Sequence, residues 1–325
     1  MRLRTVSCQE PGWRRVRHGR GFRYLDAAGA PLPPEDVARV KALVIPPAWT
    51  YVWICPHPRG HLQAVGTDDA GRRQYLYHPA WREQRDLEKF ERVQELARRL
   101  PGMRRRLRRQ LRTPDDPRER VLAAAVRLID LGCFRLGAEQ YAEENGSHGL
   151  TTLERRHLRR ENGGFRFAFV GKAGIEHEVH VEDPDVCAVL DELARARRGA
   201  DRLLAAKDGR RWKPVTPEEI NEHVRAVTGL DVTAKDFRTW HATVTVAVAL
   251  AATPRAASAT ARKRQVRAAV EEAARLLGNT PAVARASYVD PRVVDLFDDG
   301  TVLDTVPRGQ DSADRAVVRL LDARG

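Results

Sequence analysis

The chain has 325 residues, of which 42% are hydrophobic and 31% are charged, a composition that allows two globular cores and excludes disorder throughout. Its formal net charge of +13 and its pI near 10.1 favour a polyanionic partner, with nucleic acid the leading candidate. A GC-rich genome also produces an excess of arginine and alanine. From the charge alone, a basic protein that does not bind nucleic acid therefore stays an alternative.

The cysteines and the apolar segments indicate the cellular compartment. The four cysteines, Cys8, Cys55, Cys133 and Cys187, show neither CxxC spacing nor a Cys/His ligand pattern, which predicts free thiols in a reducing compartment and no zinc site. The N-terminus lacks the apolar core of a signal peptide, and no run approaches the ~18 apolar residues of a membrane span. We therefore expect a cytoplasmic, nucleoid-associated protein without a membrane partner.

The first part of the chain has the pattern of a small sheet. Between Trp13 and His78, turn residues separate short alternating or apolar runs such as "FRYLDAAGAPL", "YVWICPHPRG" and "HLQAVGTDDAGRRQYLYH", which predict antiparallel hairpins. From Asp86 onward, apolar residues recur at helical spacing instead. We predict an α+β fold, with a β-rich N-terminal domain over 1–85 and a larger, mainly helical domain over 86–325.

Five segments of the second part carry helix start or stop signals. The first is expected to end at Pro101 and Gly102, and the second is expected to stop at Gly137. The predicted helices are 86–100, 116–137, 216–229, 236–252 and 261–278.

A β segment interrupts the helical part. In "GGFRFAFVGKAGIEHEVHV", Phe165, Phe167 and Phe169 recur at strand period, and a tight connection at "GKAG" leads into a returning strand. One side of that strand carries Ile175, His177, Val179 and Val181, and the other carries Glu176, Glu178 and His180. The pattern predicts a small antiparallel sheet with Lys172 at a hairpin tip.

Arginine is concentrated between Arg98 and Arg112, where "RRLPGMRRRLRRQLR" holds eight arginines in fifteen residues. This stretch is either the solvated face of a helix or a surface that contacts phosphates, and both interpretations stay open. Lysine is rare, with seven residues against fifty arginines, so Lys172 is unusual. Unlike arginine, lysine has a pKa that an electropositive pocket can lower enough for proton donation.

Two arginines have the surroundings of a phosphoryl-transfer site. Such chemistry needs a nucleophile, cationic donors for the non-bridging oxygens and an acid for the leaving alkoxide. Arg135 in "CFRLG" and Arg238 in "KDFRTWHA" are flanked by apolar residues, and arginine donates two parallel hydrogen bonds without deprotonating. A structural ion pair explains either arginine alone. Together with Lys172 and the late Tyr288, the pair favours chemistry on a phosphate.

The chain resembles the type IB DNA topoisomerases of the poxvirus-like bacterial group. The resemblance lies in the order of five residues and in the sequence segments around them: Arg135, Lys172, Arg238, Asn279 and Tyr288. The segment "VIPPAWTYVWICPHPRGHLQAVGTDDAGRRQYLYHP" resembles their N-terminal DNA-clamp domain. Four later segments resemble the catalytic motifs of these enzymes, in the same order: "FRLGAEQYAEENGSHGLTTL", "FVGKAGIEHEV", "KDFRTWHAT" and "LGNTPAVARASYVDP". The resemblance implies the catalytic fold shared by these enzymes and tyrosine recombinases.

The resemblance also implies a role for each motif residue. Tyr288 would attack the scissile phosphate and hold the DNA 3′ end as a phosphotyrosine while supercoils relax by strand rotation. Arg135 and Arg238 would stabilise the transition state, and Lys172 would protonate the departing 5′ oxygen. Many members carry histidine where Asn279 stands. The asparagine amide can donate the same hydrogen bond to a phosphate oxygen, but it carries no charge or transferable proton.

The N-terminal part contains expected DNA contacts. Arg73, Tyr75 and Tyr77 alternate onto one face of a predicted strand, with Gln74 opposite, and ordinary sheet surface is the plain interpretation. By resemblance, four residues match positions that contact DNA near the cleavage site: Gln74, Tyr75, Tyr77 and Arg85.

Two other functions stay open at this point. A tyrosine recombinase shares the Arg, Lys, Arg and Tyr arrangement, but typically has histidine three residues before the second arginine, where this chain has Lys235. A non-catalytic DNA-binding protein with relic motifs is the other. His241, three positions after Arg238, is expected to be a packed histidine satisfied by a neighbour.

No cofactor or metal is expected. A phosphotyrosine keeps the energy of the phosphodiester bond, so resealing needs no nucleotide, and the sequence has no G-x-x-x-x-G-K-[ST] phosphate loop. Cationic side chains make a metal cluster unnecessary for the transition state. We expect a monomer that forms a clamp around double-stranded DNA and needs neither ATP nor metal.

Overall fold

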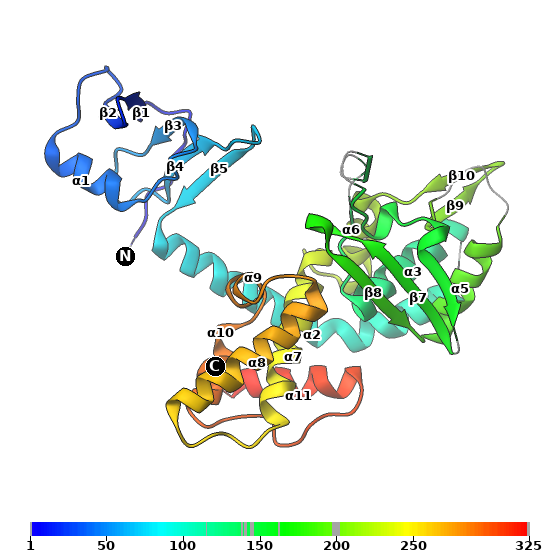
Figure 1. Cartoon of the computed structure of the whole chain (residues 1–325). Coiled ribbons are helices and arrows are strands. Elements are labelled where there is room, and N and C mark those ends of the chain that lie inside the picture. The colour runs from blue at the N-terminus through cyan, green and yellow to red at the C-terminus, as the bar shows by residue number, and fades with distance from the viewer. Residues whose placement is uncertain are drawn as a thin grey trace. The chain divides into compact units, whose positions relative to one another are not determined.

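The computed structural model describes residues 2–114, 116–137, 139, 142–143, 146–161, 163–196 and 202–323. Parts of the motif "FRLGAEQYAEENGSHGLTTL" lie outside the described residues. The chain divides into two compact units, Met1–Lys89 and Phe90–Gly325 (Figure 1). It combines helix and sheet, with a small antiparallel sheet in the first unit and a helical core in the second, which confirms the predicted class at that level.

The first unit is built on one five-stranded antiparallel sheet in the order β2-β1-β3-β4-β5. Its strands are β1 (Trp13–His18), β2 (Gly21–Leu25), β3 (Thr50–Ile54), β4 (Leu62–Thr67) and β5 (Arg73–Tyr77). Helix α1 (Pro34–Ala42) belongs to the same unit and was not predicted. At nine residues the helix is shorter than the window of about 11–18 residues in which helical periodicity is recognised, so its pattern was overlooked.

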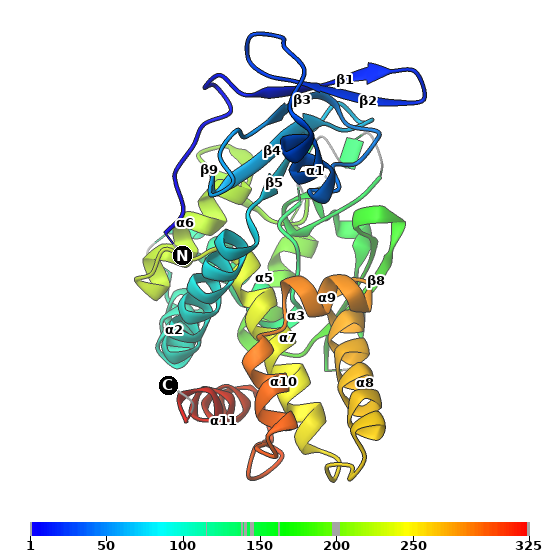
Figure 2. The ribbon, with the colours of Figure 1, turned by 90° about the vertical axis from the view of Figure 1, so that its left-hand side faces the viewer.

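The second unit is mainly helical. Helices α7, α8 and α10 lie side by side in Figures 1 and 2, and α9 follows directly from the end of α8. The bounds are α2 (Pro79–Arg112), α3 (Pro117–Gly132), α5 (Pro184–Arg195), α6 (Pro217–Thr228), α7 (Ala234–Ala251), α8 (Ala259–Leu277), α9 (Pro281–Ser287), α10 (Pro291–Asp298) and α11 (Gln310–Asp322). The predicted helices at 216–229, 236–252 and 261–278 are confirmed as α6, α7 and α8.

Three predicted helix boundaries are wrong. Helix α2 starts at Pro79, before the expected 86, and continues through Pro101 to Arg112. Buried residues recur on both sides of this proline, so packing of one continuous apolar stripe overrides the local break. Helix α3 stops at Gly132 and not at Gly137, because Cys133 adopts a left-handed conformation with φ 52°.

A three-stranded antiparallel sheet completes the second unit, in the order β6-β7-β8. Strands β7 (Gly164–Val170) and β8 (Glu176–Val181) are as the sequence predicts, with Phe165, Phe167 and Val181 buried. Strand β6 (Leu158–Glu161), which pairs with β7, was not predicted. A 3-10 turn, η3 (Lys172–Gly174), forms the tip of the β7–β8 hairpin. A second hairpin, β9 (Ala205–Asp208) and β10 (Arg211–Pro214), was not predicted because its strands are only four residues long.

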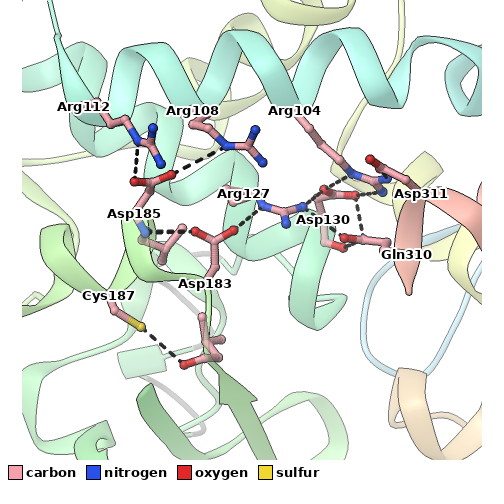
Figure 3. A network of polar contacts seen from close by, with 12 residues as sticks. Arg104, Arg108, Arg112, Arg127, Asp130, Asp183, Asp185, Cys187, Gln310 and Asp311 are labelled. Carbon is pink, nitrogen blue, oxygen red and sulfur yellow. Dashed lines mark hydrogen bonds and ion pairs between the residues drawn. The ribbon is translucent and has the colours of Figure 1, made fainter. Parts of the chain in front are cut away.

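The arginine-rich end of α2 is mainly a structural ion network (Figure 3). Arg104 is buried and makes two hydrogen bonds to Asp130, of 2.8 Å from Nε and 2.9 Å from Nη2. Arg112 Nε lies 2.8 Å from an Asp185 oxygen, and Arg108 points to the same carboxylate at 3.7 Å. These contacts tie α2 to α3 and α5 and account for Arg104, Arg108 and Arg112. A phosphate-contacting role for the exposed arginines of the stretch stays a prediction.

Candidate active site

Arg238 lies on α7 with its guanidinium enclosed by protein. Only 4% of the residue is exposed. Its Nη1 donates to the carbonyl oxygen of Cys133 at 2.5 Å, and its Nη2 donates to that of Leu277 at 2.8 Å. The Cys133 carbonyl is available because α3 ends there in a left-handed turn. The ends of two other helices thus fix the position of Arg238.

Arg135 reaches the same place from the segment after α3. Its Nη2 donates to Asn279 Oδ1 at 2.5 Å, and its Nη1 lies 3.4 Å from the Leu277 carbonyl oxygen that Arg238 also contacts. Burial, and then the charge of Arg238, lower the pKa of Arg135 from its ordinary value. The C-terminus of α8, where the helix dipole is negative, therefore holds two arginines together.

Neither arginine is neutralised by an acid. Within the described parts of the chain, no carboxylate forms an ion pair with Arg135 or Arg238, in contrast to Arg104. Backbone carbonyls and an amide satisfy some of their N–H groups but leave the two positive charges uncompensated. This argues against the structural ion pair as the reason for either residue and leaves an electropositive site.

Tyr288 faces this pair from the end of α9. The guanidinium carbon of Arg238 lies 5.4 Å from the centre of the tyrosine ring. Thr243 Oγ1 on α7 lies 3.3 Å from the Tyr288 carbonyl oxygen, which anchors the backbone. Burial alone would raise the pKa of the phenol, but the charges of Arg238, Lys235 and Arg135 hold that pKa below its ordinary value. The hydroxyl is therefore easier to ionise than a free tyrosine.

Asn279 follows Gly278, which ends α8 in the left-handed region at φ 58°. The hydrogen bond from Arg135 fixes the amide orientation, with Oδ1 as acceptor. Its Nδ2 is buried and has no hydrogen-bond partner among the residues that the structure describes. A buried donor without an acceptor costs about 1–3 kcal/mol, and the folded protein carries this cost at the candidate site.

Lys172 stands at the tip of the β7–β8 hairpin and is exposed. It makes no hydrogen bond or ion pair with any described residue. A small cavity of about 20 Å³ is lined by Lys172 together with Arg135 and Arg238, so the hairpin brings the lysine to the site of the two arginines. Ala173 next to it has φ 64°, a conformation that side chains with a Cβ rarely adopt.

Sequence reasoning missed three residues near this site. Lys235 lowers the pKa of Tyr288, and its place one helical turn before Arg238 was a signal that could have identified it. His148 and His177 line the cavity beside Arg135 and Lys172. No spacing rule connects those histidines to the motif, because they come from a loop and from the returning strand β8.

His241 lies away from the arginine pair. Its Nε2 is 3.6 Å from Asp130 Oδ1, outside hydrogen-bond range, and the side chain is largely buried against the ion network of α2. The histidine is packed as predicted, but its Nε2 has no hydrogen-bond partner among the described residues, so the expected satisfying neighbour is not found. Burial alone would raise the pKa of Asp130, but hydrogen bonds and the charge of Arg104 hold it far below its ordinary value.

The expected DNA contacts of the first unit are placed on and after β5. Tyr75 and Tyr77 are exposed and stacked, with ring centres 6.2 Å apart, while Gln74 faces the other side and donates to Asp68 at 2.9 Å. Arg85 lies on α2, exposed, 3.0 Å from Glu88. The alternation along β5 is as predicted.

Neither a metal centre nor a membrane helix is found in the described part of the chain. No group of three or more His, Cys, Asp or Glu side chains is arranged to hold a metal ion there. Within the same residues, no helix is both long and apolar enough to cross a bilayer.

Comparisons with known proteins match both units. Residues 78–296 match the family described as eukaryotic DNA topoisomerase I, catalytic core, and residues 21–68 match bacterial DNA topoisomerase IB, N-terminal domain. The chain is 29% identical over 271 residues to "DNA topoisomerase 1B" of Acanthamoeba polyphaga mimivirus, covering 81% of this chain and 80% of that protein. It is 22% identical over 250 residues to "DNA topoisomerase 1B" of Vaccinia virus (strain Copenhagen), covering 75% of each.

Proposed function

Because the chain belongs to the type IB DNA topoisomerase family, we propose that it relaxes supercoiled duplex DNA by nicking one strand, allowing it to rotate and resealing it. This is an isomerase reaction that needs neither ATP nor a metal ion. The observation that carries the residue-level proposal is the convergence of Arg135 and Arg238 on the half-buried Tyr288, with no partner carboxylate for either arginine among the described residues.

The first step is attack by the Tyr288 hydroxyl on the scissile phosphate. The phenol proton passes to solvent, a bond forms between the tyrosine oxygen and phosphorus, and the bond from phosphorus to the 5′ oxygen breaks. Lys172 supplies the proton that the 5′ oxygen takes up. Resealing reverses these transfers, so the phosphodiester is recovered without an external energy source.

Arg135 and Arg238 stabilise the charge that collects on the non-bridging oxygens. Each guanidinium has five N–H donors, and each uses two in the contacts described, so donors are left for a phosphate. Asn279 adds its Nδ2 donor. Such donors are effective because they are fixed before the reaction and their site is shielded from water.

The alternatives are weaker. Lys235 stands where a tyrosine recombinase typically has histidine, and residues 21–68 match the N-terminal domain of bacterial enzymes of this family. A relic would have no reason to keep a buried amide donor unpaired, because that donor only costs stability in the free protein. We propose that 86–325 has the catalytic fold that type IB topoisomerases share with tyrosine recombinases.

The remaining proposals concern DNA. We propose that the chain acts as a monomer whose two units form a clamp around the duplex, with the protein associated with the nucleoid. In the first unit, four side chains on and after β5 would contact the DNA near the cleavage site. These are Gln74, Tyr75, Tyr77 and Arg85.

Plasmid relaxation with chelator and without ATP tests the activity, and Tyr288→Phe tests the nucleophile. The variant should bind DNA normally but form no covalent adduct, because it keeps the ring and loses only the attacking oxygen. Tyr24→Phe, in the first unit, is the matched control and should cleave normally. Strict dependence on Mg²⁺ or ATP would contradict the activity, and a protein-linked 3′ end in Tyr288→Phe would contradict the nucleophile.

A further inference from the structure

His177 occupies a narrow place between two segments of the candidate site. The ring stacks on Phe169, with centres 5.2 Å apart and planes 14° from parallel. A methyl group on Gly171 would lie 2.5 Å from its Cδ2, and one on Gly278 would lie 2.2 Å from its Cε1. Real Cβ atoms do not approach this closely, so the imidazole fits only because both neighbours are glycine.

The two glycines precede two proposed functional residues. Gly171 comes immediately before Lys172, and Gly278 comes immediately before Asn279. Within the described residues, no hydrogen bond or ion pair joins the hairpin tip, 172–174, to the end of α8. The ring of His177 is therefore the contact that sets the spacing between the hairpin and the turn at Gly278.

The charge state of the ring suits this place. Burial, followed by the charges of Arg135 and Arg238, lowers the pKa of His177 from its ordinary value. A neutral ring leaves the positive field of the arginines unchanged. A permanently cationic side chain would be repelled there, and an acidic one would cancel the charge that the phosphate needs.

We propose that His177 is a positioning residue, which holds the Lys172 hairpin at the correct distance from Asn279 and the arginine pair by packing between Gly171 and Gly278. The inference rests on the proposed role of Lys172 as proton donor. Proton transfer needs donor and acceptor within hydrogen-bond reach, and a displacement of about 1 Å can cost about 10²-fold in rate. His177 acts through Lys172 and does not itself transfer a proton.

The test compares two substrates in single-turnover cleavage. In one, the bridging 5′ oxygen is intact; in the other, sulfur replaces it, and its thiolate leaves without a proton. His177→Ala should lose about 10–10²-fold on the oxygen substrate and recover most of this on the sulfur substrate, as Lys172→Ala should. Ile175→Ala, on the same hairpin, is the control and should cleave both at the parent rate. Should His177→Ala not fold, His177→Leu keeps most of the volume for folding but replaces the flat ring by a branched side chain that does not match the space between the two glycines. It should then lose about 10-fold on the oxygen substrate and recover this on the sulfur substrate, and an equal loss on both substrates would contradict the inference.

Coupling between the two residues gives an independent criterion. The double variant of His177→Ala and Lys172→Ala should cleave the oxygen substrate no slower than Lys172→Ala alone, because His177 has nothing left to position. Losses that multiply, or a His177→Ala defect of equal size on both substrates, would overturn the inference while Tyr288-dependent relaxation stands. Lys172→Ala with the parent rate on the oxygen substrate would overturn the proposed acid and this inference together.

Discussion

Replacing Asn279 separates the stability of the free protein from catalysis. The two polar atoms of the side chain differ in their contacts. Oδ1 accepts a hydrogen bond from Arg135 at 2.5 Å, whereas the buried Nδ2 has no acceptor among the described residues. Asn279→Ala removes a hydrogen bond to a charged group, worth about 1.5–3 kcal/mol, and relieves an unpaired donor, which costs about 1–3 kcal/mol. The two nearly cancel, so the free energy of unfolding should change by less than about 2 kcal/mol.

The effect on cleavage should be much larger. If Nδ2 donates to a non-bridging oxygen, losing this aimed donor should slow cleavage by about 10²–10³-fold, or about 2.7–4 kcal/mol. Asn279→Asp should be slower still. Its carboxylate keeps the contact with Arg135 but neutralises part of the positive charge and repels the phosphate.

The cleavage rate is measured as the rate at which the covalent protein–DNA complex forms on a duplex designed so that the cut strand cannot be resealed. Thermal unfolding measures the stability of the free protein. Asn221→Ala is the matched control, because Asn221 Oδ1 accepts from the Ala234 backbone at 3.1 Å, a helix-end contact that should affect stability and not cleavage. The reasoning fails if Asn279→Ala cleaves at the parent rate, or if Asn279→Asp cleaves faster than Asn279→Ala.

Two further predictions concern stability. Arg104→Met should lower the free energy of unfolding by about 3–5 kcal/mol because it leaves the fully buried Asp130 without its main partner, whereas Arg108→Met, on an exposed arginine of the same helix, should cost under about 1 kcal/mol. Denaturant titration measures both, and equal losses would contradict the network. Burial, and then the neighbouring His148, lower the pKa of His157 to about 4 from about 6.5. The unfolded state therefore takes up a proton first as the pH falls from about 6.5 to about 4, and stability should decline across that window. His157→Gln should flatten this decline, and an unchanged slope would assign the titration to other groups.

The parts of the fold that the sequence predicts are those with strong local periodicity. The β7–β8 hairpin follows from phenylalanines at every second position, and α6 from Thr216 and Gly229 at its two ends. Helix α1 was missed because its nine residues are too few for the periodicity to stand out. Pro101 was misread because the apolar stripe of α2 continues past it, so tertiary packing, and not local preference, decides the structure there.

The candidate site was predicted as a set of residues but not as an arrangement. Spacing and resemblance identify Arg135 and Tyr288, yet nothing in the sequence says that Arg135 bonds to Asn279 across 144 positions. His177 was predicted on the same side of its strand as Val179 and Val181, but its packing against Gly278 depends on how β8 meets α8. Contacts of this kind are set by the packing of distant elements.

The role of a buried arginine cannot be predicted from this sequence, which contains fifty arginines. Arg104 and Arg238 are both buried arginines on helices with apolar neighbours, and the sequence offers no rule that separates them. What separates them is the partner: carboxylates around Arg104, backbone carbonyls around Arg238. A carboxylate cancels the guanidinium charge, so the pair serves the fold. A carbonyl satisfies the N–H groups and leaves the charge intact, which orients the side chain without consuming its attraction for a phosphate. The charge of Arg238 therefore stays available beside Arg135 and Tyr288, and that arrangement exists only in the folded protein.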